Sequence, residues 1–202
     1  MLLEGKKILI MGIRNKWSIA FGIAKSAYEN GAQLLFTYMG EENKEKIEEL
    51  VSEFKGSKAY VLNGASEDEK VRETFTKIKE ENGKIDGIVH AIAHANTEDL
   101  RNDFILTSRS GYAHACDVSA YSLIAVAKIT KELDMLNAGA SIVSYTYYGA
   151  EKVMTEKVKQ QHMFSNKMIA GILIPVVLEQ LLNSIMGTAD TMMVSNVGSA
   201  AI

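Results

Sequence analysis

Gly12 and Ser18 are the first residues whose types and spacing could bind a charged ligand. Gly12 permits a tight turn after a short apolar run, and Ser18 stands where the N-cap of the next helix is expected. The free N–H groups and the dipole of such a helix would favour a pyrophosphate. Because the segment GIRNKWSIA (12–20) lacks the G-x-G-x-x-G spacing, a glycine turn with a serine cap and no ligand is the alternative interpretation.

The elements that would position this turn alternate along the chain. Short apolar runs predict strands, and amphipathic segments between them predict helices. The strands are expected at 6–12, 33–38, 58–62, 84–95 and 140–148, and the helices at 18–32, 41–54, 66–82 and 118–136. This order predicts an α/β fold: an incomplete, Rossmann-type, doubly wound parallel sheet of about five strands, followed by a hydrophobic helical tail.

Such a sheet binds ligands at the carboxyl ends of its strands, near the switch in strand order. The candidate site is therefore spread over the loops that follow Met11, Tyr38, Leu62, Ile92 and Tyr147.

Bulk composition narrows the function classes. The net charge of -3 and the single cysteine, Cys116, argue against a nucleic-acid surface and against an internal disulfide framework. No arginine-rich or short apolar leader precedes the first predicted strand, so a cytoplasmic setting is expected for residues 1–153.

Three segments resemble a known family when taken together. They are GIRNKWSIAFGIAKSAYENGAQLLFTY, IDGIVHAIAHAN and DFILTSRSGYAHACDVSAYSLIAVAK. In this order they are similar to bacterial enoyl-acyl carrier protein reductases, a divergent branch of the short-chain dehydrogenase/reductase superfamily. The resemblance covers residues 1–153 and implies an oxidoreductase of fatty-acid biosynthesis that acts on enoyl-acyl carrier protein.

The resemblance also implies roles for individual residues. Gly12, Ser18 and Ile19 match the diphosphate-binding turn, and Ile92 matches a residue on the nicotinamide side. Ala95 matches a residue that touches the acyl substrate.

A tyrosine at the end of the fifth predicted strand completes the implied site. Tyr147 matches the first of two active-site tyrosines, with Tyr148 as the alternative if the register slips by one. Without the family context, a core aromatic residue at a strand end is the simpler interpretation.

The turn after the second predicted strand indicates the cofactor. A 2′-phosphate would need Arg or Lys directly after that strand, whereas the turn MGEEN (39–43) is acidic before Lys44. We therefore expect NADH, and no metal.

Three residues depart from the family pattern or could carry a proton. Gly64 stands where the family usually places an aspartate that faces the adenine, so only backbone contacts from Gly64 and Ala65 are expected there. His94 replaces a common phenylalanine and is either a proton-bearing site residue or a polar loop histidine. His90, inside a strand, is predicted to be a core histidine with satisfied hydrogen bonds.

The chemistry that the resemblance implies needs groups that the sequence lacks. Hydride transfer to a trans-2-enoyl thioester forms an enolate, which the family stabilises with a second tyrosine and a lysine. By spacing from Tyr147 these should fall near 157 and 164, where the sequence has Lys157 and Phe164. Impaired catalysis and a doubtful homo-oligomer are expected of a chain that is truncated in this way.

The segment from Met154 onward has a different composition. It contains an uncharged stretch, Met168–Leu178, and stays mostly apolar to Val194. Residues 154–202 resemble the N-terminal segment of MATE-type multidrug efflux transporters, which implies a first transmembrane helix and membrane association through 168–194. An amphipathic helix on a soluble core is the alternative.

Two domains follow from this change: a truncated NAD-binding domain at 1–153 and an unrelated hydrophobic segment at 154–202. A chimeric chain of this kind leaves two other functions open. One is a nucleotide-binding remnant without turnover, and the other is a membrane-anchored transporter fragment.

Overall fold

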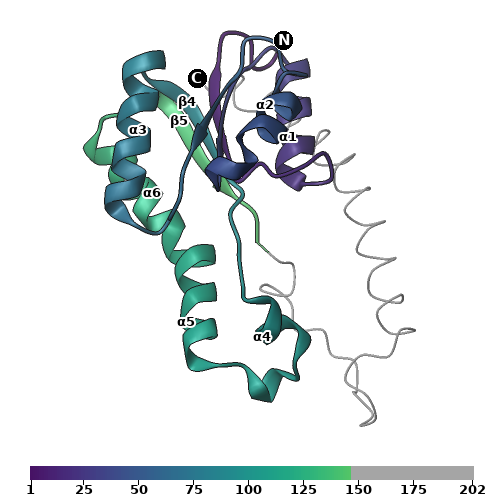
Figure 1. Ribbon diagram of the computed structural model, residues 1–202. Helices are drawn as coiled ribbons and strands as arrows, with labels where there is room; N and C mark the ends of the chain where they lie inside the picture. Colours follow the sequence, from purple (N-terminus) through teal and green to yellow (C-terminus); the bar gives the residue numbers. More distant parts are fainter. Residues whose placement is uncertain (147–202) are drawn as a thin grey trace, which may run out of the picture. The chain divides into compact units, whose positions relative to one another are not determined.

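The apolar runs form a parallel sheet in the computed structural model, which describes residues 1–146 (Figure 1). The strands are β1 (Lys7–Met11), β2 (Gln33–Tyr38), β3 (Lys58–Val61), β4 (Ile85–His90) and β5 (Leu136–Ser144). Their order is β3-β2-β1-β4-β5, and every neighbouring pair is parallel. The predicted doubly wound α/β class and its five strands are therefore confirmed, and the order reverses beside β1.

Helices cover both faces of this sheet. They are α1 (Ile19–Glu29), η1 (Glu41–Asn43), α2 (Lys44–Val51), α3 (Asp68–Asn82), α4 (Thr97–Arg101), η2 (Phe104–Leu106), α5 (Arg109–Cys116), η3 (Asp117–Tyr121) and α6 (Ser122–Glu132). Helices α1 and α2 lie on one face, and α3 and α6 lie on the other (Figure 1). Right-handed crossovers produce this division, because the chain moves in opposite directions before and after β3.

Consecutive buried residues of β1 divide between the two layers. Leu9, Ile10 and Met11 are fully buried. Ile10 packs in the cluster that contains α1 and α2, whereas Leu9 and Met11 pack in the cluster that contains α3 and α6. A strand covered on both faces has no polar side, which explains its uninterrupted apolar sequence.

Two predicted strand boundaries are wrong. The strand expected at 84–95 ends at His90, because β1 offers its last partner there, Met11 opposite His90. The strand expected at 140–148 begins at Leu136 and ends at Ser144. Its earlier start follows a reversal at Asp134, whose φ of 46° turns the chain directly after α6.

The helix expected at 118–136 is also wrong at both ends. Helical structure begins at Arg109 and runs through α5, the π-helix η3 and α6 to Glu132. The start was missed because Gly111 weakens a helical pattern. In the structure a Cβ at Gly111 would lie 1.7 Å from Asp99 Oδ2, so glycine lets α4 approach α5.

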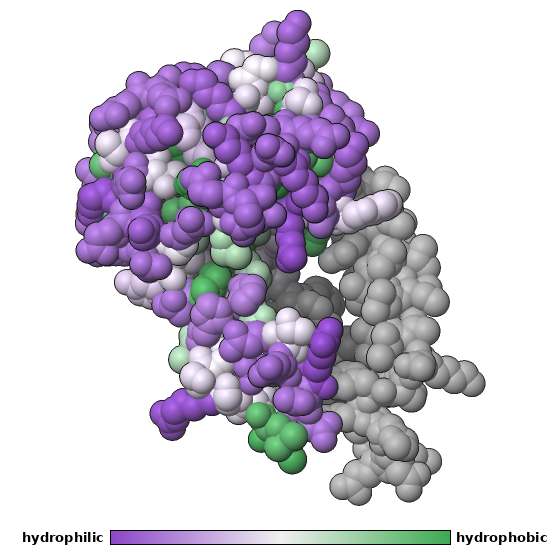
Figure 2. Space-filling view, viewed as in Figure 1, coloured by the Kyte–Doolittle hydropathy of each residue, from purple (hydrophilic) through white to green (hydrophobic). Residues whose placement is uncertain are grey.

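Residues 97–116, here called the α4–α5 arm, extend away from the sheet (Figure 1). Its end exposes large apolar side chains at Leu100, Phe104, Ile105 and Leu106. Figure 2 shows a hydrophobic patch at that end, below a mostly hydrophilic surface. The predicted hydrophobic tail lies outside the described residues.

Candidate functional site

Gly12 brings two loops together at the reversal of the strand order. Its φ is 81°, and a Cβ there would lie 2.3 Å from the Ala91 carbonyl oxygen and 3.2 Å from Ile92 Cγ1. The Gly12 N–H donates to the Thr37 carbonyl at 3.0 Å. The turn after β1 is therefore packed against the loop after β4, and only glycine allows this approach.

Ser18 occupies the predicted N-cap position of α1. Its backbone is extended (φ -69°, ψ 141°), but its hydroxyl donates to the Asn15 carbonyl at 2.6 Å and makes no side-chain cap. The first N–H groups of α1 therefore have no side-chain acceptor from Ser18 and could donate to an anion. Ile19, which begins the helix, is 53 % exposed beside them.

The loops after β2 and β3 are joined by a side chain that the sequence did not single out. Asn63 Oδ1 accepts the Gly40 N–H at 2.9 Å. Gly64 has a φ of 85°, and Ala65 is buried in the core cluster that Ile92 also contacts. Gly64 and Ala65 thus lie at the same edge of the sheet as Gly12, as expected.

The loop after β4 carries Ile92 and Ala95, both partly buried. His94 between them is exposed, and its Nδ1 lies 2.9 Å from His114 Nε2 on α5. The backbone N–H of His94 donates to Ser119 Oγ at 3.1 Å, and the Ser119 hydroxyl lies 3.2 Å from the His94 carbonyl oxygen. His94 is therefore an exposed residue of the loop after β4, a position compatible with either of the two interpretations of the sequence.

His90 is a buried core residue, as the sequence predicted. Its Nε2 lies 2.8 Å from Ser122 Oγ, which donates to the Val118 carbonyl at 2.6 Å. Since that hydroxyl proton is used, Nε2–H of His90 must be the donor to Ser122. Burial lowers the pKa of His90 below its usual 6.5, so the ring stays neutral near pH 7.

The π-helix η3 supplies site contacts that sequence reasoning missed. Asp117 accepts a hydrogen bond from Ser66, in the loop after β3, at 2.6 Å. Ser119 holds the loop after β4, as described above. The π-helical turn η3 thus forms hydrogen bonds with the loops after β3 and β4. Single π-helical turns are frequent at functional sites. No local pattern in DVSAY signals these contacts, because the partners are far away in sequence.

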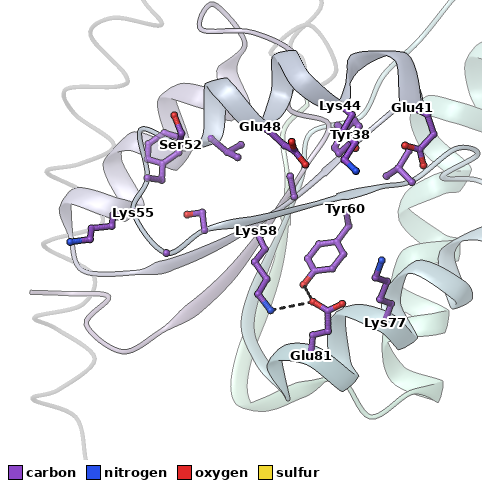
Figure 3. Close-up of a pocket in the computed structure, with 16 residues that line it drawn as sticks. Tyr38, Glu41, Lys44, Glu48, Ser52, Lys55, Lys58, Tyr60, Lys77 and Glu81 are labelled. Carbon is purple, nitrogen blue, oxygen red and sulfur yellow. Dashed lines mark hydrogen bonds and ion pairs between the residues drawn. The ribbon is translucent and has the colours of Figure 1, made fainter.

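A cavity of about 680 Å³ lies elsewhere, along the outer edge of β3 (Figure 3). Tyr60 and Lys58 meet Glu81 in it, at 2.8 and 3.1 Å. Burial raises the pKa of the Tyr60 phenol to about 12, although the hydrogen bond from Asn82 acts to lower that pKa. Glu41 and Lys44, from the turn used to predict the cofactor, line it, but none of the glycines or of the other residues matched to the family's site does. Size alone therefore does not locate the candidate site here.

The described residues include the predicted cofactor and substrate positions but not the predicted catalytic tyrosine. The predicted site residues that the structure describes all follow the carboxyl ends of strands: Gly12, Ser18, Ile19, Gly64, Ala65, Ile92 and Ala95. Tyr147 lies outside the described residues, as do Tyr148, Lys157 and Phe164. Within residues 1–146, no three His, Cys, Asp or Glu side chains come together to bind a metal ion.

Comparison with known proteins identifies related sequences. A family model described as enoyl-(acyl carrier protein) reductase matches residues 12–168. That match continues past the predicted junction at Val153–Met154.

Two similar relatives differ in the cofactor that their names give. The enoyl-[acyl-carrier-protein] reductase [NADH] FabI of Bacillus cereus is 42% identical over 154 residues, which are 76% of this chain and 59% of that protein. The [NADPH] enzyme of Staphylococcus aureus is 45% identical over 150 residues, 74% of this chain and 58% of that protein.

A solved structure has a similar fold. The enoyl-[acyl-carrier-protein] reductase (NADH) from Aquifex aeolicus VF5 has a TM-score of 0.69 and 40% identity, over 76% of this chain and 59% of that one. The chain therefore spans about three-fifths of the length of the relatives that it matches.

Proposed function

Because the chain belongs to the enoyl-(acyl carrier protein) reductase family, we propose that residues 1–146 form the NADH-binding part of an enzyme that reduces trans-2-enoyl-acyl carrier protein in fatty-acid biosynthesis. The observation that carries the proposal is the close packing of Gly12 against Ala91 and Ile92. It joins the turn after β1 to the loop after β4 where the strand order reverses, and dinucleotides bind at that place in such sheets.

The diphosphate would lie at the start of α1. Gly12 lets the turn before α1 pack against the loop after β4, and the first N–H groups of α1 have no side-chain cap from Ser18. These donors and the helix dipole would favour negative charge at this place.

The adenosine end would meet the loops after β2 and β3. Glu41 and Glu42 begin η1, which follows β2 after Met39 and Gly40, and both are exposed. Carboxylates there would repel a 2′-phosphate, so NADH is expected to bind more tightly than NADPH. Asn63 fixes the spacing of the two loops through Gly40.

The nicotinamide end would lie against Ile92, and the acyl substrate against Ala95. Hydride transfer to the β-carbon of the thioester forms an enolate whose oxygen needs a hydrogen-bond donor, the role proposed for Tyr147. With Lys157 and Phe164 at the positions expected for the second tyrosine and the lysine, turnover is expected to be weak.

The test separates binding from chemistry. NADH fluorescence is titrated with the chain, and oxidation of NADH is followed at 340 nm with a trans-2-enoyl thioester. We expect saturable binding that is at least tenfold tighter for NADH than for NADPH, with slow oxidation or none. Failure to saturate with either nucleotide would refute the proposal.

Reversing the charge of one residue tests whether the turn after β2 causes the preference for NADH over NADPH. Glu42→Arg should reduce the NADH preference severalfold, because a guanidinium pairs with a 2′-phosphate. Glu80→Arg, at an exposed position of α3, makes the same change of charge and should leave the preference unchanged.

Binding without oxidation would favour the second candidate, a nucleotide-binding protein without turnover. The absence of the second tyrosine and of the lysine favours it. The transporter resemblance of residues 154–202 and its membrane association stay predictions outside the described residues. Among the helices of residues 1–146, none has both the length and the apolar character needed to cross a membrane.

A further inference from the structure

His94 and His114 stand close enough to act on one ligand together. Their facing nitrogens, Nδ1 of His94 and Nε2 of His114, are 2.9 Å apart, and the rings cross at 80° with centroids 5.1 Å apart. Both side chains are exposed, so a solute can reach them. From this geometry we propose that the two histidines form a bidentate site for a late divalent transition metal ion such as Ni²⁺ or Cu²⁺.

The nitrogen spacing supports this class of metal. At metal–nitrogen distances of about 2.0–2.1 Å, nitrogens 2.9 Å apart subtend an angle of about 90° at the ion. That angle suits square-planar or octahedral coordination, whereas two corners of a tetrahedron would need a spacing of about 3.3 Å. Imidazole nitrogen is a preferred ligand of Ni²⁺ and Cu²⁺. In the structure the two nitrogens point almost directly at each other, as in a hydrogen bond, so both exposed rings would rotate to turn their lone pairs toward one ion, which would take the place of that hydrogen bond.

The backbone around His94 is already fixed for such binding. Ser119 lies within hydrogen-bond distance of both the N–H and the carbonyl oxygen of His94, at 3.1 and 3.2 Å. His114 lies in the last turn of α5, which continues into η3 and therefore into Ser119. Because the His94 backbone and the helix that carries His114 are already in place, only the two side chains would have to lose conformational freedom when the ion binds.

Binding would clamp the loop after β4 to α5. That loop carries Ile92 and Ala95, so the ion would bind next to the proposed nicotinamide and acyl positions without using their side chains. No third His, Cys, Asp or Glu joins the pair within residues 1–146, so water would complete the coordination.

Calorimetric titration of the full chain with Ni²⁺ tests the site. We expect one ion per chain, and at least a tenfold weaker affinity in both His94→Phe and His114→Ala. Phenylalanine keeps an aromatic ring at position 94 but removes its nitrogens, so the loop retains its packing. Circular dichroism of each variant checks that the helices are preserved.

Matched controls assign the binding to this pair. His162→Ala and Cys116→Ser each remove another metal-binding side chain, and both should retain the affinity of the original chain. Ni²⁺ should also raise the melting temperature of these two controls but not that of His94→Phe. If Ni²⁺ does not bind, if His94→Phe binds it with unchanged affinity, or if either control abolishes binding, the proposed site is wrong.

Discussion

At the scale of single residues, Gly12 is the position where backbone geometry and the proposed nucleotide site meet. A side chain there faces two costs, the left-handed φ of 81° and a backbone oxygen 2.3 Å from the new Cβ. Gly56 has a similar φ of 84°, but nothing lies within 4 Å of a Cβ built on it. We expect Gly56→Ala to lower the free energy of unfolding by about 1–2 kcal/mol and Gly12→Ala by about 1–3 kcal/mol more.

Urea unfolding of the two variants measures this difference, with unchanged m-values as the check on the comparison. Equal losses would mean that the Ala91 carbonyl moves aside freely. In that event Gly12 would be needed only for its turn, and the packing that supports the nucleotide site would be weaker than the structure indicates.

At the scale of elements, a buried hydrogen bond joins strand β4 to helix α6. His90 donates to Ser122, and both side chains are almost completely buried. Ser122→Ala would leave the buried Nε2–H of His90 without an acceptor. We expect this change to lower the free energy of unfolding by about 1–3 kcal/mol, the usual cost of a buried unsatisfied donor.

Ser144→Ala is the matched control, since Ser144 on β5 is exposed and lies 3.4 Å from the other nitrogen of the same ring. Solvent can replace that contact, so the loss should stay below about 1 kcal/mol. Equal losses in thermal or urea unfolding would show that β5 holds His90 as firmly as α6 does.

At the scale of the whole described unit, the sheet is unevenly protected. Strand β1 lies at its centre between β2 and β4, with both faces covered. Strand β5 is an edge of the described sheet, and most of its residues are exposed. We expect amide hydrogens of β5 to exchange at least tenfold faster than those of β1, because local opening exposes little apolar surface at that edge.

Hydrogen exchange followed by mass spectrometry gives both rates from one sample. The other edge strand, β3, is an internal reference, because α2 and α3 flank it. Protection of β5 equal to that of β1 would show that something covers this edge in solution.

The sequence by itself determined the class of fold, one turn and one helix start. β2 was predicted with its observed bounds, Gln33–Tyr38, because a short apolar run between polar segments is a local signal. Gly12 and the Ser18 N-cap were also read correctly, since turns and helix starts depend on residues adjacent in the chain.

Only the tertiary structure decided how the ligand-side loops are held. The extended helix from Arg109 depends on Gly111 meeting Asp99, and the end of β4 depends on where β1 stops. The contacts of η3 with Ser66 and His94 join residues 51 and 25 positions apart. Such pairs leave no local pattern, because sequence periodicity reports which face of an element is buried and not which partner covers it.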